Sequence, residues 1–270
     1  MGSYTIPMYA DREVDHMGMI ASCSLLLCVF APAVFAQEPA GSKSETALIP
    51  EGVFVMGSPE GEGLPNEHPQ RKVYLDAFEM DKNLVTVSDY KKFADKVKRE
   101  MRKQPDYSAG NHPVVNVSWA DAAAYCGWAG KHLPTEAEWE KAARGGATTK
   151  WSFGSDESRL DDYAWHDRNS DNKSHPAGQK KPNQYGLYDM GGNVQEWVAD
   201  WYGPYAYPRP PQRNPTGPLS ASCMTGDDVA TNYCRVTRGG PWMTRPAARL
   251  LLDPDKWTEH LGFRCARSKT

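Results

Sequence analysis

The sequence lacks the charge pattern and the short motifs that mark several common functional classes. Its 270 residues carry a formal net charge of −3, so no excess of basic residues favours nucleic acid or an anionic membrane surface as a partner. It contains no CxxC, HExxH or HxH pattern, no P-loop, no dinucleotide-binding glycine fingerprint and no GxSxG motif. These absences argue against a zinc ribbon, a thioredoxin-type centre, a nucleotide-binding fold and a common serine hydrolase.

Internal repeats of fixed period are also lacking, whereas large rings and turn-forming residues are abundant. The sequence has nine tryptophans, thirteen tyrosines, 23 glycines and 21 prolines. This composition is typical of a chain that packs aromatic rings between turns and irregular segments. The length is sufficient for one large domain with a sizeable core.

One apolar run, MGMIASCSLLLCVFAPAVFA at residues 17–36, lies near the N-terminus and ends in a small-x-small pattern. We predict a signal peptide with an upstream extension over residues 1–36, a polar linker over 37–47 and a folded domain over 48–268. The expected location is therefore periplasmic or secreted. An uncleaved membrane anchor is the alternative interpretation of the apolar run.

Four cysteines follow the predicted signal peptide, an even number that suits disulfides in an oxidising compartment. Three connectivities are possible, and one of them joins Cys126 to Cys265 and Cys223 to Cys234. In the chain-entropy model, a bridge that closes a loop as long as the first would stabilise the fold by about 4–5 kcal/mol.

Regular elements are predicted mainly in the first half of the chain. Thr86, Ser118 and Thr135 are candidate N-caps of three helices, and Gly145 and Gly146 stop the third. Strands are predicted by alternating or short apolar segments. These segments lie at 49–58, 71–82, 235–239 and 261–267.

The segment GLYDMGGNVQEWVADWY, residues 186–202, combines carboxylates and glycines with aromatic residues. Asp189 and Glu196 lie seven residues apart, and the glycines between them allow backbone carbonyls to point toward the same centre. Oxygen ligands on a tight loop suit a hard cation, Ca²⁺ before Mg²⁺. The alternative is that Asp189 or Glu196 caps a helix or pairs with an arginine while the aromatic rings pack.

Several segments taken together resemble the formylglycine-generating enzyme (sulfatase-modifying factor) family. They occur in family order over residues 48–267 and read IPEGVFVMGS, HPVVNVSWADAAAYCGWAGKHLPTEAEWEKAARGG, GLYDMGGNVQEWVADWY, RVTRGGPW and LGFRCAR. The resemblance implies an α+β fold, an elaborated C-type-lectin-like (formylglycine-generating enzyme) fold with little regular secondary structure. The family includes copper oxidases, the C-terminal domain of ergothioneine sulfoxide synthases and the pyoverdine-maturation protein branch.

The resemblance also implies structural Ca²⁺, with one or two ions. The first site would use the side chains of Asp189 and Glu196 and the main-chain oxygens of Gly192 and Val194. A second site would fall near Asp162 and Tyr163, with Asn169 and Asp171 as further candidates, although the spacing there departs from the family pattern. Cys126 and Cys265 stand at positions that form a disulfide in the family, and Cys223 and Cys234 in an inserted segment are expected to bridge each other.

The resemblance fails at the family's redox centre. Thr244 and Arg249 stand where the two copper-binding cysteines would be, Pro241 replaces a serine, and Gln195 replaces an active-site tryptophan. Thiolates select Cu(I), whereas a hydroxyl and a guanidinium do not. We therefore expect no copper and no formylglycine-generating oxidase activity.

Other residues near the old centre could line a pocket. Thr244, Arg249, Glu259 and His260 are the main candidates, and a Glu/His/Arg set could transfer protons in a cleft. The favoured alternative is that such residues form salt bridges and solvated loops. The neighbouring residues considered with them are Trp242, Arg245 and Asp253.

The sequence thus favours an exported family member that acts as a calcium-stabilised binding, maturation or accessory subunit. Its partner would be another periplasmic or membrane-complex protein, bound through the insertion at 204–234 or through the old active-site cleft. The main alternative is an oxidase or non-heme-iron-type enzyme with altered chemistry, as in the pyoverdine-maturation branch. A weaker alternative is a cell-surface carbohydrate binder.

Overall fold

The computed structural model describes residues 44–204, 212–221, 223–224, 230–231 and 233–269. The predicted signal peptide, most of the linker and parts of the predicted insertion lie outside these ranges. Among the residues described, no helix has the length and apolar character needed to cross a bilayer.

The three predicted helices are present and begin at the predicted caps. They are α1 (Val87–Val97), α2 (Trp119–Trp128) and α3 (Glu136–Arg144). Thr86 caps α1 through its side chain, and Ser118 and Thr135 form full capping boxes with the residues three positions later. Gly145, at φ 60°, ends α3 in the left-handed conformation that glycine adopts without strain. A four-residue helix, α4 (Leu160–Tyr163), lies in a loop-rich segment, and short 3₁₀ turns span Pro65–Glu67 and Glu157–Arg159.

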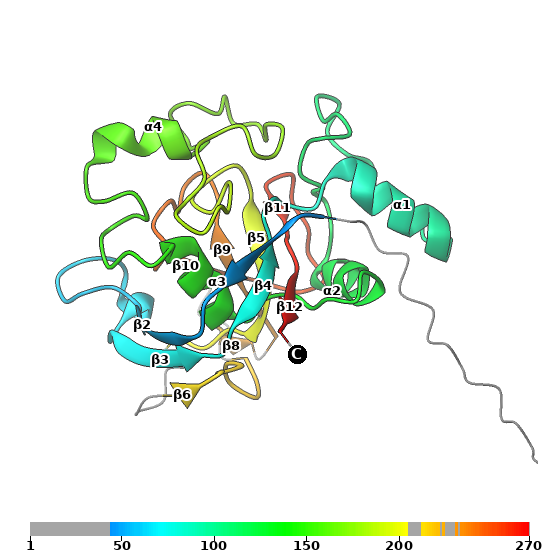
Figure 1. The fold of residues 1–270 in the computed structure, drawn as a ribbon. Coiled ribbons are helices and arrows are strands. Elements are labelled where there is room, and N and C mark those ends of the chain that lie inside the picture. The colour runs from blue at the N-terminus through cyan, green and yellow to red at the C-terminus, as the bar shows by residue number, and fades with distance from the viewer. Residues whose placement is uncertain (1–43, 205–211, 222, 225–229, 232, 270) are drawn as a thin grey trace, which may run out of the picture. The chain divides into compact units, whose positions relative to one another are not determined.

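The strands form several small sheets rather than one large sheet (Figure 1). The longest sheet has the order β10-β9-β5-β11, in which β5 pairs antiparallel with β9 and parallel with β11. Two three-stranded sheets have the orders β1-β4-β12 and β2-β3-β6, and β7 pairs with β8. The bounds are β1 Thr46–Ile49, β2 Gly52–Met56, β3 Arg71–Leu75, β4 Phe78–Asp81, β5 Gln195–Trp201, β6 Gln212–Arg213, β7 Cys223–Met224, β8 Ala230–Thr231, β9 Arg235–Gly239, β10 Arg249–Leu252, β11 Leu261–Gly262 and β12 Ala266–Ser268.

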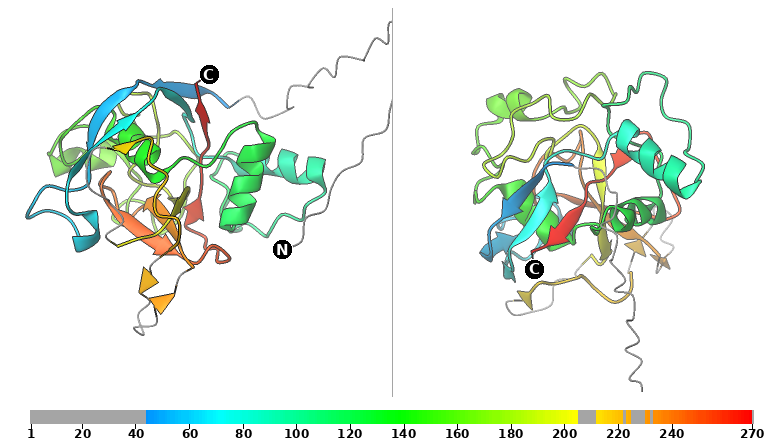
Figure 2. Two further views of the ribbon diagram at one scale, coloured as in Figure 1. Left: turned by 90° about the horizontal axis from the view of Figure 1, so that it is seen from below. Right: turned by 45° about the vertical axis from the view of Figure 1, so that its right-hand side comes forward.

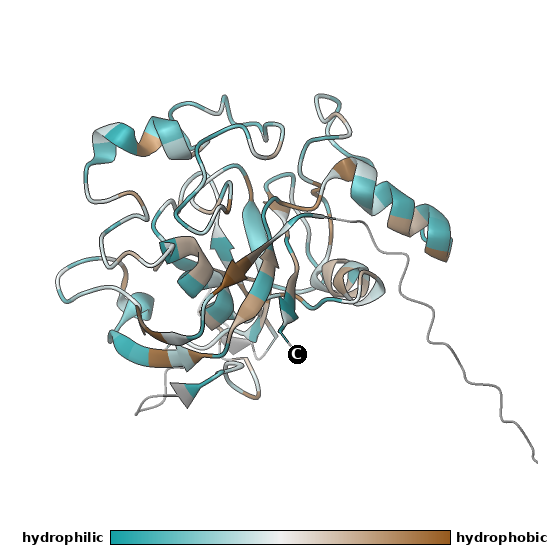
Figure 3. Cartoon of the chain, in the orientation of Figure 1, coloured by the Kyte–Doolittle hydropathy of each residue, from teal (hydrophilic) through white to brown (hydrophobic). Residues whose placement is uncertain are grey.

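Two apolar clusters hold these elements together. One gathers residues of β1–β4 around Trp139 of α3, and the other packs α1 and α2 around Trp197 and Phe263. Figure 2 shows α1 and α2 side by side, and the mostly teal surface of α1 in Figure 3 agrees with its exposed polar face. The predicted α+β architecture with modest helix and strand content is confirmed.

The four cysteines of the described ranges are paired in the predicted connectivity, as Cys126–Cys265 and Cys223–Cys234. The first bridge ties α2 to the segment that leads into β12, and both of its cysteines are fully buried. The second bridge lies in the predicted insertion. Another part of the insertion adds β6 to β3, and Asn214 bonds to the backbone and side chain of Asp76.

Candidate functional site

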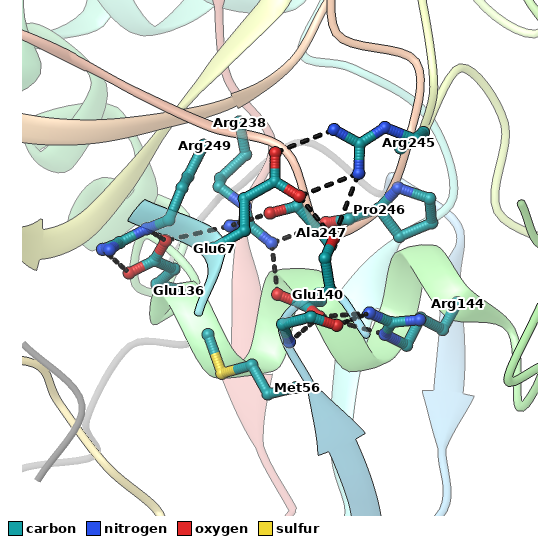
Figure 4. A network of polar contacts seen from close by, with 12 residues as sticks. Met56, Glu67, Glu136, Glu140, Arg144, Arg238, Arg245, Pro246, Ala247 and Arg249 are labelled. Atoms are coloured by element: carbon teal, nitrogen blue, oxygen red, sulfur yellow. Dashed lines mark hydrogen bonds and ion pairs between the residues drawn. The ribbon is translucent and has the colours of Figure 1, made fainter. Parts of the chain in front are cut away.

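The start of α3 carries two buried glutamates that meet arginines from distant strands. Glu136 and Glu140 lie one helical turn apart, so they occupy the same face of α3. Arg238 of β9 donates to Glu136 at 2.9 Å and to Glu140 at 2.6 Å. Figure 4 shows the carboxylates and guanidinium groups converging above α3. All three side chains are buried, so the charges compensate one another away from water.

Arg249, at the position of one missing cysteine, belongs to this buried network. Its Nε and Nη2 each donate to Glu136 at 2.7 Å, a bidentate pair, and its Nη1 donates to the carbonyls of Asn66 and Gly203. The residue is only 1 % exposed. Burial alone would raise the pKa of Glu136, but Arg249 and Arg238 outweigh it and hold that pKa below its usual value. Arg249 is therefore a structural ion-pair residue, as in the alternative interpretation of the pocket candidates.

The loop between β9 and β10 is fixed from two sides. Arg245 makes a bidentate pair with the buried Glu67, with both N–O distances 2.8 Å, and Ser58 also donates to Glu67. From beneath, Arg238 donates to the carbonyls of Pro246 and Ala247. The segment in which the resemblance places the redox cysteines is thus held by salt bridges and hydrogen bonds.

Thr244, at the position of the other missing cysteine, faces a small cavity. Its hydroxyl accepts a hydrogen bond from the indole N–H of Trp151 at 3.1 Å. The cavity volume is about 30 Å³, room for one or two water molecules. Trp151, Phe153 and Tyr163 form a stacked row beside it. The cavity is too small for a substrate in the conformation described.

The remaining pocket candidates lie nearer the surface. Glu259 is exposed, and His260 is partly buried with its ring edge-on to Trp242 at 4.9 Å between centroids. Burial lowers the pKa of His260, so its neutral form is favoured. The structure therefore places Thr244, Arg249 and the Glu259–His260 pair in three different environments and does not assemble one catalytic constellation from them.

The glycine-rich loop before β5 contains a buried carboxylate with an unused oxygen. Asp189 has φ 60° and is 2 % exposed. Its Oδ2 accepts a hydrogen bond from the backbone N–H of Gly178, whereas its Oδ1 has no hydrogen-bond partner among the described residues. Burial raises the pKa of Asp189 to about 6. An orphaned, buried carboxylate oxygen is a group that a cation would satisfy.

Glu196 behaves differently from Asp189, because both of its oxygens accept from Arg264, at 2.7 and 2.9 Å. The alternative interpretation of this loop, a carboxylate paired with an arginine, thus applies to Glu196. Gly192 and Val194 lie between the two acids and are buried. A Cβ at Gly192 would lie 2.3 Å from the carbonyl oxygen of Trp165, so this position accepts only glycine. Across the described ranges, no three His, Cys, Asp or Glu side chains converge as a metal site.

Three of the four residues predicted for a second calcium site have other contacts. Asp162 pairs with Lys181 at 2.9 Å, Tyr163 stacks on Phe153, and Asn169 bonds to the backbone of His166 and Ala164. The structure therefore adds no support for a second ion.

Four buried acids in this region were not identified from the sequence: Glu67, Glu136, Glu140 and Asp200. Asp200 of β5 accepts from the backbone N–H of Glu136 at the start of α3, and burial, reinforced by the charge of Glu136, raises the pKa of Asp200 to about 8. The glutamates four residues apart in EAEWE offered a signal for Glu140, but the sequence does not show which arginines approach them.

Comparison with known proteins places these features in context. The model of the sulfatase-modifying factor enzyme 1-like domain matches residues 31–269. The chain is 33 % identical to a formylglycine-generating enzyme of Streptomyces coelicolor, over 86 % of this chain and 91 % of that protein. It is 29 % identical to the inactive C-alpha-formylglycine-generating enzyme 2 of Mus musculus, over 90 % and 91 %. The structure of PvdO from Pseudomonas aeruginosa is similar with a TM-score of 0.71 and 26 % identity, over 83 % of this chain and 94 % of that chain.

Proposed function

The chain belongs to the sulfatase-modifying factor enzyme 1-like family, and on that premise we propose that it is an exported member without copper oxidase activity. In this proposal it acts as a calcium-stabilised binding, maturation or accessory subunit for another periplasmic or membrane-complex protein.

The replacement of the cysteine pair supports the loss of oxidase activity. Thr244 is bonded to Trp151, and the guanidinium of Arg249 is committed to Glu136. Neither group supplies a thiolate, and a buried cation disfavours a metal cation nearby. The cysteines within the described ranges are all in disulfides, so none of them offers a substitute thiol. The likeness to a mouse relative named as inactive agrees with this proposal.

The orphaned oxygen of Asp189 supports a structural calcium ion. Asp189 would hold the ion together with main-chain oxygens at Gly192 and Val194, and Glu196 would contribute its charge while remaining paired to Arg264. When bound, calcium supplies positive charge that neutralises the buried carboxylates and links the loop to its neighbours. The protein's own residues position the loop, and this role involves no reaction.

Exposed aromatic residues support a role in binding. Trp242 is 49 % exposed, and Trp257 is half-exposed against the guanidinium of Arg102. Tryptophan and arginine are frequent anchors in protein interfaces. Such a surface, or the disulfide-bonded insertion, would contact the partner. Two disulfides suit an exported protein.

Metal analysis and oxygen consumption test this proposal. The full chain is purified from the periplasm of an expressing bacterium, and its metals are measured by mass spectrometry. We expect about one calcium ion per chain, copper and iron far below stoichiometry, and no oxygen consumption with a cysteine-containing sulfatase peptide. Stoichiometric copper or iron, or peptide-dependent oxygen use, would overturn it.

A second candidate function is an oxidation with altered chemistry, as suggested for the pyoverdine-maturation branch. The structural likeness to PvdO favours this candidate, and His260 with Glu259 would then transfer protons at the surface. It predicts substrate-dependent oxygen use that falls at least about tenfold in His260→Ala and Glu259→Gln. If both variants kept a demonstrated activity, this candidate would be excluded.

A further inference from the structure

A larger cavity lies between strand β2 and the C-terminal end of α3, separate from the cavity at Thr244. Its volume is about 300 Å³, at the lower end of the range for small-molecule sites. Its walls come from β2, from the last turn of α3 and the residues that follow it, and from Tyr185. β2 is an edge strand of its sheet within the described structure.

Lys141 lines this cavity, and its ammonium group has few partners. The residue is 5 % exposed, and its Nζ donates to the carbonyl of Gly52 at 2.9 Å. No carboxylate of the described ranges forms an ion pair with it; Glu51, on the cavity rim, is exposed and acts only through its more distant charge. Burial lowers the pKa of Lys141, which reflects the cost of holding this charge away from water. An anion in the cavity would offset that cost.

Two other residues that line the cavity, Arg144 and Tyr185, have donors that are not fully used. Arg144 uses Nε and Nη2 to bind Glu140, and Nη2 also donates to the carbonyl of Gly57, which leaves Nη1 without a partner among the described residues. The hydroxyl of Tyr185 likewise has no partner there, and both residues line the cavity. The C-terminal end of a helix carries a partial negative charge that opposes an anion. This effect is weakened at α3, because the carbonyl of Ala142 already accepts hydrogen bonds from Gly145 N–H and the side chain of Asn183.

The opposite wall is apolar. Val53 is exposed at 60 %, and Phe54 and Val55 follow it along β2. Glu140 neutralises Arg144, and Glu51 adds a negative charge at the rim, so the site suits a singly charged anion rather than a phosphate dianion. We propose that this cavity binds a carboxylate ligand with an apolar or aromatic body, whose carboxylate meets Lys141, Arg144 and Tyr185 and whose body lies against β2.

Calorimetric titration of the full chain tests the proposal with a matched pair of probes. N-acetylphenylalanine carries the carboxylate and the aromatic body, whereas N-acetylphenylalaninamide has the same body without the charge. We expect the acid to bind at least about tenfold more tightly than the amide. Equal binding of the two probes, no binding of the acid at millimolar concentration, or inorganic phosphate binding as tightly as the acid would overturn the proposal.

Substitutions then locate the site. Lys141→Met keeps the apolar stem and should weaken binding of the acid at least about tenfold, without lowering the melting temperature, because a costly buried charge is removed. Glu51→Gln should tighten binding by a factor of about two or more, because it removes a repelling charge. Lys96→Met, on the exposed face of α1, is the control and should change nothing. Unchanged binding of the acid by Lys141→Met would refute the site. These results are independent of metal content and oxygen use.

Discussion

Arg249, which the resemblance places at the position of a copper-binding cysteine, is a structural ion-pair residue, and Arg249→Met tests that conclusion. The substitution keeps an unbranched apolar side chain and removes the guanidinium. In the structure that group donates twice to Glu136 and once each to the carbonyls of Asn66 and Gly203, and it lies 5.0 Å from the ring centroid of Tyr202. All of these contacts would be lost together.

The expected cost follows from the burial of Glu136. Removing one partner of a buried ion pair costs about 3–5 kcal/mol, because the other charge stays buried without compensation. Arg238 still donates to Glu136 at 2.9 Å, which places the expectation near the lower limit. We therefore expect Arg249→Met to lower the free energy of unfolding by about 3 kcal/mol at pH 7.

Urea unfolding followed by tryptophan fluorescence measures this loss. The double variant Glu136→Gln with Arg249→Met should recover at least about 1 kcal/mol relative to the single variant, because the stranded charge is gone. Arg213→Met removes an exposed ion pair with Asp76 and should cost less than about 1 kcal/mol. A loss for Arg249→Met no larger than that of Arg213→Met would refute a structural role. If the role is correct, Arg249→Cys would not simply rebuild a cysteine pair, since it removes the same contacts.

Three other predictions concern pH, metal and the long disulfide. Burial raises the pKa of Asp200 from 3.8 to about 8, so between these pH values the folded protein keeps a proton that the unfolded chain has released. The free energy of unfolding should therefore fall as the pH rises, by up to about 1.4 kcal/mol per pH unit. The same pH dependence in Asp200→Asn would contradict this prediction. Calcium at about 100 times its dissociation constant should stabilise the native protein by about 2.7 kcal/mol, measured by thermal unfolding against a control with a chelator. If calcium stabilised Asp189→Ala by the same amount, the proposed site would be contradicted. Replacing Cys126 and Cys265 by alanine should lower the free energy of unfolding by about 4–5 kcal/mol in denaturant titration, and a loss below about 1 kcal/mol would contradict the expected gain from closing so long a loop.

Local chemistry explains why the helices could be predicted from the sequence. Thr86, Ser118 and Thr135 cap their helices through bonds to residues three positions later, so the whole interaction lies within a short segment. The stop at Gly145 is equally local, because it depends on a backbone conformation that glycine favours. After residue 186, the predicted strand at 235–239 matches β9, whereas β5 and β10 were not predicted, since their pairing depends on partners far along the chain.

The candidate site was only partly predictable. Asp189 and Glu196 form a similar acidic pair in the sequence, yet Arg264 occupies both oxygens of Glu196 and leaves one oxygen of Asp189 without a partner. Nothing near either acid in the sequence distinguishes them, because Arg264 is 68 residues from Glu196. The cavity at Lys141 was not predicted for the same reason, since its walls come from three separate segments.

The sequence by itself determined where α1, α2 and α3 begin, the disulfide candidates and the lack of cysteines at positions 244 and 249, because each of these depends on residue type and short spacing. Only the tertiary structure decided which charges meet. Glu136 pairs with arginines 102 and 113 residues away, and this pairing changes Arg249 from a pocket candidate into a buried support of the fold. The energy of a buried charge depends on its neighbours in space and on the exclusion of water, and the order of residues along the chain fixes neither.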